Sequence, residues 1–214
     1  MEAYLAAKSR LFAELLPADG TAVINADAPE AAALTAMAEA HGQRLIRYGH
    51  NGNELRLRSV NPGTAWLDLE IEVFGAPHHL RLPVAGTFQA MNALAALGLV
   101  LAEEDVAPAE ALAALARVGG VPGRVEHVGT TPAGGEVYVD YAHTPDALET
   151  VLRALRPHTA GRLFAVYGCG GDRDPGKRPM MGEVARRLAD RRIITDDNPR
   201  SEDPDAILDA ITAG

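Results

Sequence analysis

The amino-acid sequence predicts an α/β protein with two domains. In its C-terminal part, three short apolar runs each end in a cluster of glycine and polar residues, and each is followed by a helical pattern. The N-terminal part also alternates strand-like and helical patterns. Such alternation is typical of open α/β sheets, in which ligands bind at the carboxyl ends of the strands.

The first 123 residues supply the N-terminal domain. Segments 55–84 alternate polar and apolar residues between Asn-Pro-Gly and Gly-Ala-Pro turns, so we expect an antiparallel β meander there. The other expected elements are helices at 1–16, 29–41, 86–102 and 108–118 and strands at 21–25 and 44–48. Because Gly119 to Arg124 is the best linker in the chain, we place the domain boundary near Gly123 and the second domain at 124–214.

Lys8 is the unusual residue of the first helix. It shares a stripe at helical spacing with Tyr4, Leu11 and Leu15, so it interrupts an apolar face. Either its stem covers apolar surface while the ammonium reaches water, or the amine is desolvated and has a lowered pKa.

The second domain is predicted to contain three buried parallel strands, because its apolar runs are continuous. These runs are 137–139, 163–166 and 193–194. Thr144 can cap the first following helix with Pro145 at its first position, ahead of residues 146–155. The other two helices are expected at 177–188 and 204–211.

Composition limits the possible functions. The 214 residues are 47% hydrophobic and have a formal net charge of −9, which argues against a general nucleic-acid or membrane-surface binder. The single cysteine, Cys169, excludes an internal disulfide and a multi-cysteine metal site. These features fit a cytoplasmic protein that binds neither nucleic acid nor membranes. We also expect the protein to be a monomer.

One motif is misleading. Gly171 to Lys177 has the form G-x-x-x-x-G-K of a phosphate-binding loop, but Arg178 stands where that loop needs a Ser or Thr hydroxyl. A dinucleotide fingerprint beginning at Gly168 fails because Arg173 replaces its third glycine. What remains is a glycine turn that presents charged side chains at a strand end. Either these side chains recognise a zwitterion, or they are only solvated.

Two other strand ends hold candidate ligand-binding residues. Asp140 can accept hydrogen bonds from ribose hydroxyls, and His143 can contact a phosphate or stabilise the turn. Asp196 to Arg200 places carboxylates, an amide and a guanidinium in one turn, a set able to bind an ammonium and a carboxylate together. The planar guanidinium of Arg200 matches a carboxylate bidentately.

The ordered series EAYLAAK, GTFQAMNALAA, GRVE, VDYAHTPDALE, GCGGDRDPGKRPMMG and TDDNPRSEDP resembles the Mur ligase family over essentially the whole chain. The resemblance is to the members that join meso-diaminopimelate to UDP-N-acetylmuramoyl-L-alanyl-D-glutamate (UDP-MurNAc-L-Ala-D-Glu), using ATP and Mg²⁺ through an acyl phosphate. It implies part of the central ATPase domain followed by part of the Rossmann-like C-terminal domain.

The resemblance also implies residue roles. Lys8 matches a lysine carried as an N6-carboxylate that helps to hold Mg²⁺. Four residues match family residues that bind the nucleotide. Asn92 matches the residue that contacts adenine, Arg124 the one at the phosphates and Asp140 the one at the ribose, and His143 lies close to the nucleotide. Arg173, Asn198 and Arg200 match the family residues that bind diaminopimelate, and Asp197 and Pro199 lie in the same turn as Asn198 and Arg200. Gln89 departs from the family, since many relatives have Asn there.

The family's ATP loop, G-x-x-G-K-T, does not occur in this sequence. We therefore expect an internal fragment whose first methionine is not the native start and which is inactive alone. The alternative is a non-catalytic remnant, or an amino-acid-binding module.

Overall fold

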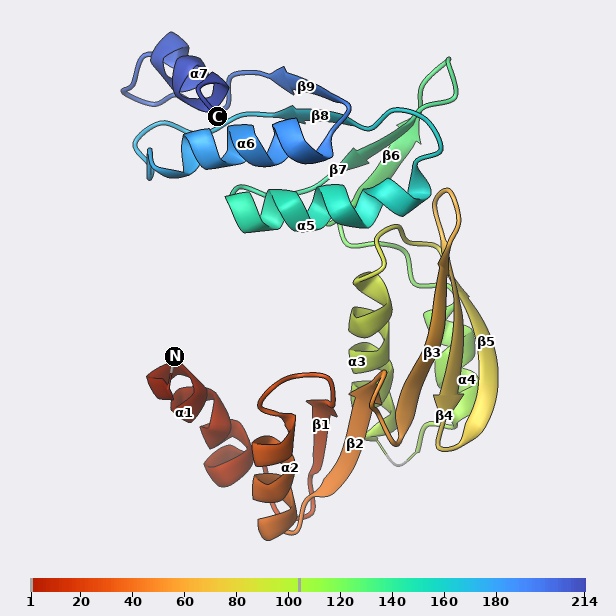
Figure 1. Ribbon diagram of the computed structural model, residues 1–214. Helices are drawn as coiled ribbons and strands as arrows, with labels where there is room; N and C mark the ends of the chain where they lie inside the picture. Colours follow the sequence, from red (N-terminus) through yellow and green to blue (C-terminus); the bar gives the residue numbers. More distant parts are fainter. Residues whose placement is uncertain (1, 104) are drawn as a thin grey trace. The chain divides into compact units, whose positions relative to one another are not determined.

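The computed structural model describes residues 2–103 and 105–214 and divides the chain into two compact units. The N-terminal unit comprises Met1–Asn61, Trp66–Pro83 and Thr87–Gly119. The C-terminal unit comprises Pro62–Ala65, Val84–Gly86 and Gly120–Gly214. Figure 1 labels the elements of both units. The domain boundary near Gly123 stays a prediction.

A five-stranded sheet with the order β1-β2-β3-β4-β5 organises the N-terminal unit. Its strands are β1 (Thr21–Asn25), β2 (Arg44–Gly49), β3 (Leu55–Pro62), β4 (Leu67–Val73) and β5 (Ala76–Leu82). β1, β2 and β3 pair in parallel, whereas β4 and β5 are antiparallel. The antiparallel pairing of β4 with β5 confirms that part of the predicted meander, and β3 lies between β4 and β2, with which it pairs in parallel.

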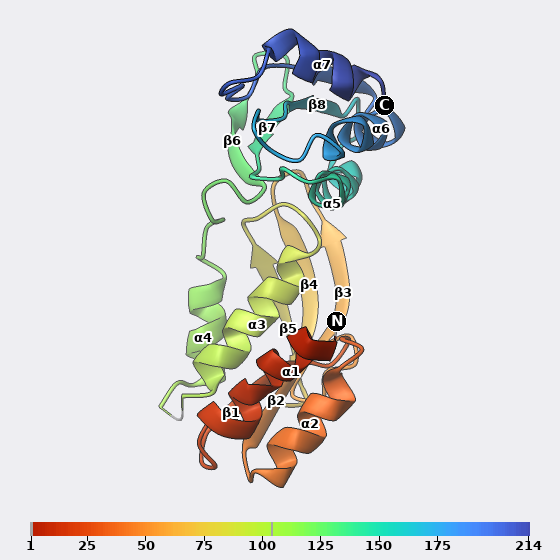
Figure 2. The same ribbon diagram turned by 90° about the vertical axis from the view of Figure 1, so that its left-hand side faces the viewer.

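Helices cover both faces of β1 and β2 (Figures 1 and 2). Ala22 and Ile24 of β1 form a buried cluster with Ala38 of α2 (Ala31–Ala40). Val23 points to the opposite face because side chains alternate along a strand. There a Cβ on Gly98 would lie 2.8 Å from Val23 Cγ1, so glycine lets α3 (Gln89–Leu101) approach the sheet closely. Helix α4 (Pro108–Leu115) buries Ala111, Leu112 and Leu115.

The N-terminal helix distinguishes the two alternatives for the environment of Lys8. Helix α1 (Glu2–Arg10) continues into a π-helical turn, Leu11–Leu15. The stripe that contains Lys8 faces solvent, with Tyr4, Leu11 and Leu15 each more than half exposed. Phe12 and Leu16 pack against the core instead. Lys8 is therefore exposed rather than desolvated, with its Nζ 5.5 Å from the Tyr4 ring centroid.

In the C-terminal unit, the first predicted parallel strand belongs to a hairpin. β7 (Glu136–Val139) pairs antiparallel with β6 (Glu126–Thr130), which the sequence analysis missed. The hairpin closes where Thr131 N donates to Gly135 O at 2.7 Å, with Gly134 at a φ of +81°. The expectation of a parallel, fully buried strand at 137–139 is thus wrong, because Val137 and Val139 are exposed.

The other two strands are parallel, as predicted. β8 (Phe164–Tyr167) pairs with β9 (Arg191–Ile194) from Phe164↔Arg191 to Tyr167↔Ile194. The helices of this unit are α5 (Pro145–Leu155), α6 (Lys177–Leu188) and α7 (Pro204–Thr212), with a short 3-10 helix at Arg156–His158. Only one face of this pair is covered, since Ala165 and Tyr167 are buried while Phe164, Val166 and Ile193 are 50%, 64% and 51% exposed.

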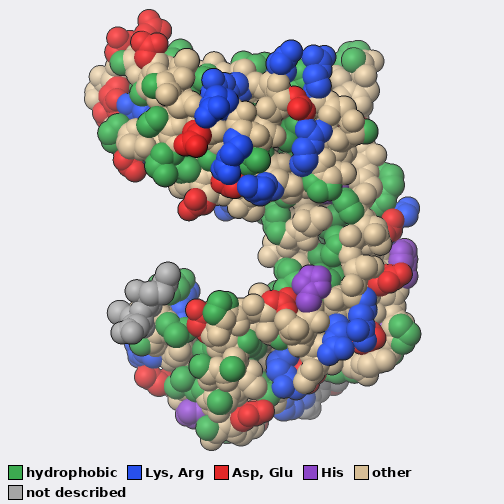
Figure 3. Space-filling view, viewed as in Figure 1, with side chains coloured by type: hydrophobic (Ala, Val, Ile, Leu, Met, Phe, Trp, Pro, Cys, Tyr) green, Lys and Arg blue, Asp and Glu red, His purple; other side chains and the backbone are tan. Residues whose placement is uncertain are grey.

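Local sequence explains where α5 begins and how it packs. Thr144 Oγ1 accepts a hydrogen bond from Ala147 N and Pro145 occupies the first turn, which confirms the predicted cap. Glu149 of α5 forms ion pairs with Arg153 and with Arg187 of α6, both at 2.7 Å. Lys and Arg side chains gather over α5 and α6 in Figure 3, and these ion pairs neutralise part of that charge. Among the described residues, no helix is long and apolar enough to span a membrane.

Candidate functional site

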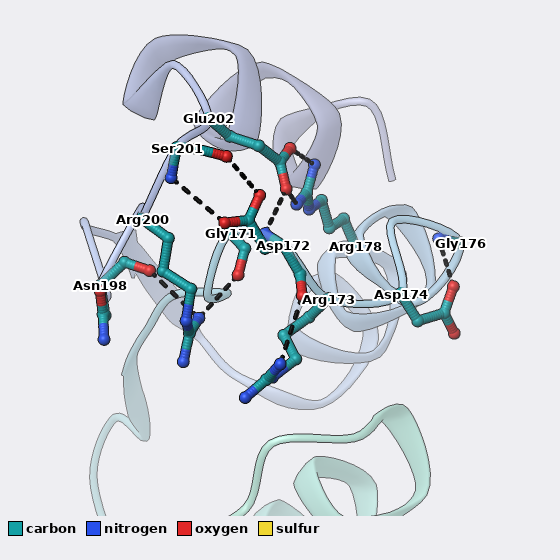
Figure 4. A network of polar contacts seen from close by, with 10 residues as sticks. All are labelled: Gly171, Asp172, Arg173, Asp174, Gly176, Arg178, Asn198, Arg200, Ser201 and Glu202. Atoms are coloured by element: carbon teal, nitrogen blue, oxygen red, sulfur yellow. Dashed lines mark hydrogen bonds and ion pairs between the residues drawn. The ribbon is translucent and has the colours of Figure 1, made fainter.

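Two loops of the C-terminal unit converge after β8 and β9 (Figure 4). We call residues 168–176 the glycine loop and residues 195–203 the proline loop. Because β8 and β9 are parallel, their carboxyl ends lie at the same edge, and the loops that follow them meet. All of the predicted acceptor-binding residues lie in these two loops.

Glycines bring the two loops into backbone contact. Gly171 N donates to Asn198 O at 3.1 Å. A Cβ on Gly171 would lie 1.8 Å from Pro199 O, and one on Gly168 would lie 2.3 Å from Thr195 O. No side chain fits at these distances, so the close approach requires glycine at both positions.

Charged side chains then join the loops. Glu202 forms two hydrogen bonds with Arg178 of α6, at 2.9 and 2.8 Å, and its Oε1 also accepts from Asp172 N at 2.6 Å. Asp172 in turn accepts from Ser201 Oγ at 2.7 Å. The glycine loop is therefore held by hydrogen bonds to the proline loop.

Neighbouring groups and burial shift the pKa values of Glu202 and Cys169. Arg178 and the backbone N–H of Asp172 lower the pKa of Glu202 below its ordinary value. Near the start of the glycine loop, burial raises the pKa of the Cys169 thiol, whose Sγ lies 3.6 Å from the sulfur of Met181. Glu202 is thus held as a carboxylate at neutral pH, while Cys169 is held as a thiol.

The side chains of Arg173, Asn198 and Arg200 point to the same side of this network (Figure 4). Arg200 Nη1 donates to Gly171 O at 2.6 Å, and Arg173 Nη1 lies 3.3 Å from Asp172 O. All three side chains are exposed. The structure therefore brings together the three residues that the sequence analysis assigned to the acceptor, as a pair of guanidiniums beside an amide.

This arrangement suits a ligand that has carboxylates. Each guanidinium can bind a carboxylate, and the amide of Asn198 offers one donor and one acceptor group. Asp197 is exposed next to Asn198 and can accept from an ammonium, while Pro199 supplies the backbone against which Gly171 packs. The sequence analysis missed Ser201 and Glu202. It used Arg178 only to reject a phosphate loop.

A second group of predicted residues lies around the start of β6 and the end of β7. Asp140 accepts from Val125 N at 2.8 Å and from Ala142 N at 2.7 Å, and Val125 is buried with a φ of +49°. Asp140 therefore stabilises the turn beside Arg124. A carboxylate has about four acceptor positions, so these two bonds leave capacity for a ligand hydroxyl.

Tyr141 links the other two residues of this group. Its exposed ring packs edge-on against His143 with centroids 5.2 Å apart, and the Arg124 guanidinium lies 5.7 Å from the ring centroid. The His143 backbone O accepts from Lys177 Nζ at 2.7 Å. The structure thus places Arg124, Asp140 and His143 together and adds Tyr141, which the sequence analysis did not select.

Asn92 and Lys8 belong to the N-terminal unit. Asn92 is exposed on α3, and its Nδ2 donates to Gln89 Oε1 at 2.8 Å. Gln89 therefore contacts the predicted adenine-binding side chain from one turn earlier on the helix. Within residues 2–103 and 105–214, no group of three or more His, Cys, Asp or Glu side chains could hold a metal ion.

Family models cover most of the chain. Residues 1–100 match the Mur ligase middle domain, and residues 123–214 match the Mur ligase glutamate ligase domain. The two matches occur in the order that the sequence analysis predicts.

Curated relatives agree with the family models. A Caulobacter vibrioides protein named UDP-N-acetylmuramoyl-L-alanyl-D-glutamate--2,6-diaminopimelate ligase is 55% identical over 211 residues, which are 99% of this chain and 43% of that protein. A Mesorhizobium japonicum protein of the same name is 50% identical over 213 residues, 100% of this chain and 44% of the relative. The chain thus spans less than half the length of these relatives.

Solved structures show the same similarity. A structure of a ligase with that name superposes with a TM-score of 0.71 at 34% identity, covering 100% of this chain and 44% of the other. A Mycobacterium tuberculosis folylpolyglutamate synthase complexed with ADP and AMPPCP has a TM-score of 0.67 at 24% identity, covering 89% and 42% of the two chains. The latter likeness concerns the fold alone.

Proposed function

Because the chain belongs to the Mur ligase family, we propose that it forms part of an ATP-dependent ligase that adds meso-diaminopimelate to UDP-MurNAc-L-Ala-D-Glu in peptidoglycan synthesis. The observation on which this depends most is the placement of Arg173, Asn198 and Arg200 on one side of two converging loops. The names of the relatives support the choice of substrates.

The proposed reaction has two steps. The D-glutamyl γ-carboxylate attacks the γ-phosphate of ATP, which gives an acyl phosphate and ADP. The amine of diaminopimelate then attacks the acyl carbon, and phosphate leaves as the amide forms. Such a reaction depends on positioning and charge neutralisation more than on covalent catalysis by the protein.

We assign the nucleotide to four residues of this chain. Asn92 would bind adenine, since an Asn amide matches the donor and acceptor of that base edge. Asp140 would accept from the ribose with its remaining lone pairs, and Arg124 would neutralise phosphate charge. His143, whose ring packs beside Tyr141, would lie next to the nucleotide.

Diaminopimelate would bind at the meeting point of the glycine and proline loops. It differs from L-lysine by a second carboxylate at the far end of its side chain, and Arg200 is the candidate cation for that group. Arg173 and Asn198 would bind the remaining polar groups, with Asp197 near an ammonium and Pro199 holding the turn. A lysine ammonium opposite Arg200 would place like charges together, which disfavours lysine.

Mg²⁺ and a carbamate on Lys8 belong to this proposal only as implied roles. When bound, Mg²⁺ would neutralise phosphate charge. The described residues build no three-ligand metal site, so we assign no step to the metal. The exposed amine of Lys8 is accessible to CO₂, and a carbamate would turn this cation into an oxygen donor.

Purified product of the native gene should form the tripeptide nucleotide from ATP, UDP-MurNAc-L-Ala-D-Glu and meso-diaminopimelate. The 214-residue chain alone should form none, because its sequence holds no ATP loop. Product from the chain alone would contradict this, whereas a native product that binds the amino acid without ligation would favour a binding module. We also propose that the protein is located in the cytoplasm.

A further inference from the structure

The ion pair between Arg178 and Glu202 lies behind the residues assigned to the acceptor. Arg178 stands in the first turn of α6, and its side chain is 5% exposed, whereas the side chain of Glu202 is 33% exposed. Nη1 and Nη2 of Arg178 each donate to a different oxygen of Glu202. This bidentate geometry fixes both the distance and the orientation of the carboxylate.

Glu202 connects three segments of the chain. It belongs to the proline loop, it is bonded to α6 through Arg178, and its Oε1 accepts from the backbone of Asp172 in the glycine loop. Asp172 completes the connection, because its carboxylate accepts from Ser201 Oγ at 2.7 Å and from Ser201 N at 3.3 Å. We name Arg178, Glu202, Asp172 and Ser201 the loop clamp.

The loop clamp adjoins the two exposed arginines in the sequence. Asp172 precedes Arg173, and Ser201 follows Arg200. Asp172 and Arg200 each have a φ of +52°, a strained conformation for a residue other than glycine that persists only where the surroundings hold it. The clamp supplies such surroundings on both sides of the contact between the loops.

We propose that the loop clamp is the positioning device that sets the separation of Arg173 and Arg200, and thereby the affinity and selectivity for the acceptor amino acid. This inference rests on the proposed function for its substrate. Arg178 and Glu202 are positioning residues in this account, since they lie on the opposite side of the network from the exposed guanidiniums (Figure 4).

The clamp can be tested on the 214-residue chain without any substrate. Arg178→Met removes the ion pair at similar volume, and Glu202→Gln keeps an acceptor oxygen but removes its charge. Arg186→Met is the matched control, because Arg186 is an exposed arginine on the same helix. In NMR spectra, both clamp variants should shift the amide signals of Asp172 and Ser201 and the guanidinium signals of Arg173 and Arg200, whereas the control should not.

A kinetic test uses the product of the native gene. Both clamp variants should raise the KM for meso-diaminopimelate about 10- to 100-fold, as expected for a misplacement near 1 Å, with little change in the KM for ATP. Arg178→Lys should be intermediate, since an ammonium cannot pair bidentately. The preference for diaminopimelate over L-lysine should fall in the same order.

Two results would overturn the inference: unchanged arginine signals in both clamp variants, or KM values for diaminopimelate equal to those of Arg186→Met. If Arg178→Met does not fold, Glu202→Gln decides the matter. If the unmodified protein does not use diaminopimelate, the proposed function fails, but the NMR comparison still tests the clamp.

Discussion

At the scale of single residues, Arg200 is the most informative side chain. Its Nη1 is bonded to Gly171 O, while the guanidinium faces the same side as Arg173. Removing a charge-assisted hydrogen bond costs about 1.5–3 kcal/mol, so Arg200→Ala should raise the KM for diaminopimelate roughly 10- to 100-fold. Steady-state kinetics on the native gene product would measure this, with the KM for ATP nearly unchanged.

Arg191→Ala is a suitable control for that experiment, because Arg191 is exposed on β9 outside both loops. An unchanged KM for diaminopimelate in Arg200→Ala, or equally efficient use of L-lysine by the unmodified protein, would mean that this turn does not select the acceptor.

Lys8 allows a second test at this scale. If its amine forms a carbamate in the native gene product, ¹³C-labelled bicarbonate should give a carbamate signal in NMR spectra that Lys8→Ala removes. Lys8→Arg keeps the positive charge but cannot form the carbamate, so both variants should lose most ligase activity. Full activity in Lys8→Arg would show that only the charge at this position matters.

At the scale of elements, the sequence predicted helix limits and caps better than it predicted which strands pair. The limits of α6 and the Thr144 cap follow from nearby residues, and the structure confirms both. β6 was missed because its exposed sequence, EHVGT, lacks apolar alternation. The sequence could predict that Arg173 and Arg200 meet, since parallel strands end at one edge, but not that Glu202 bonds to Arg178 and Asp172, which depends on tertiary placement.

The contact between the two loops predicts the effect of a single methyl group. Gly171→Ala would place a Cβ 1.8 Å from Pro199 O, so the loops must separate, at a cost of about 1–3 kcal/mol. Chemical denaturation should show this loss in the 214-residue chain. Gly161→Ala is the matched control, because no atom lies within 4 Å of its added Cβ. Equal stability of the two variants would contradict the close approach.

The ion pair of the clamp predicts a pH dependence. Arg178 and the Asp172 amide lower the pKa of Glu202 in the folded state, so its carboxylate stabilises the clamp fully above the pKa of an unfolded glutamate, about 4.3. This stabilisation is lost as the pH falls through the lower folded value. The Asp172 amide signal should therefore shift with a midpoint below about pH 4.3. A midpoint above that value, or an equal shift of the amide of Ala185 within α6, would contradict the prediction.

At the scale of the whole molecule, the exposed apolar face of β8 and β9 favours self-association, whereas the sequence analysis expects a monomer. Val166 and Ile193 are cross-strand partners, and Phe164 lies two residues before Val166, so all three side chains are on one face. Burying a large aliphatic or aromatic side chain contributes about 1.5–3 kcal/mol. A second layer on this face is therefore favourable, whether it comes from the same polypeptide or from another copy.

We accordingly expect the isolated 214-residue chain to bind an apolar dye and to self-associate as its concentration rises. Val166→Lys should weaken both effects, because it places a charge at the centre of the face without touching the buried Ala165 and Tyr167. Val128→Lys is a control on an exposed valine of β6. Sedimentation velocity would measure the association. A chain that stays monomeric at all concentrations and binds no dye would mean that this face is stable in water, and that burial on both sides is not required of this pair of parallel strands.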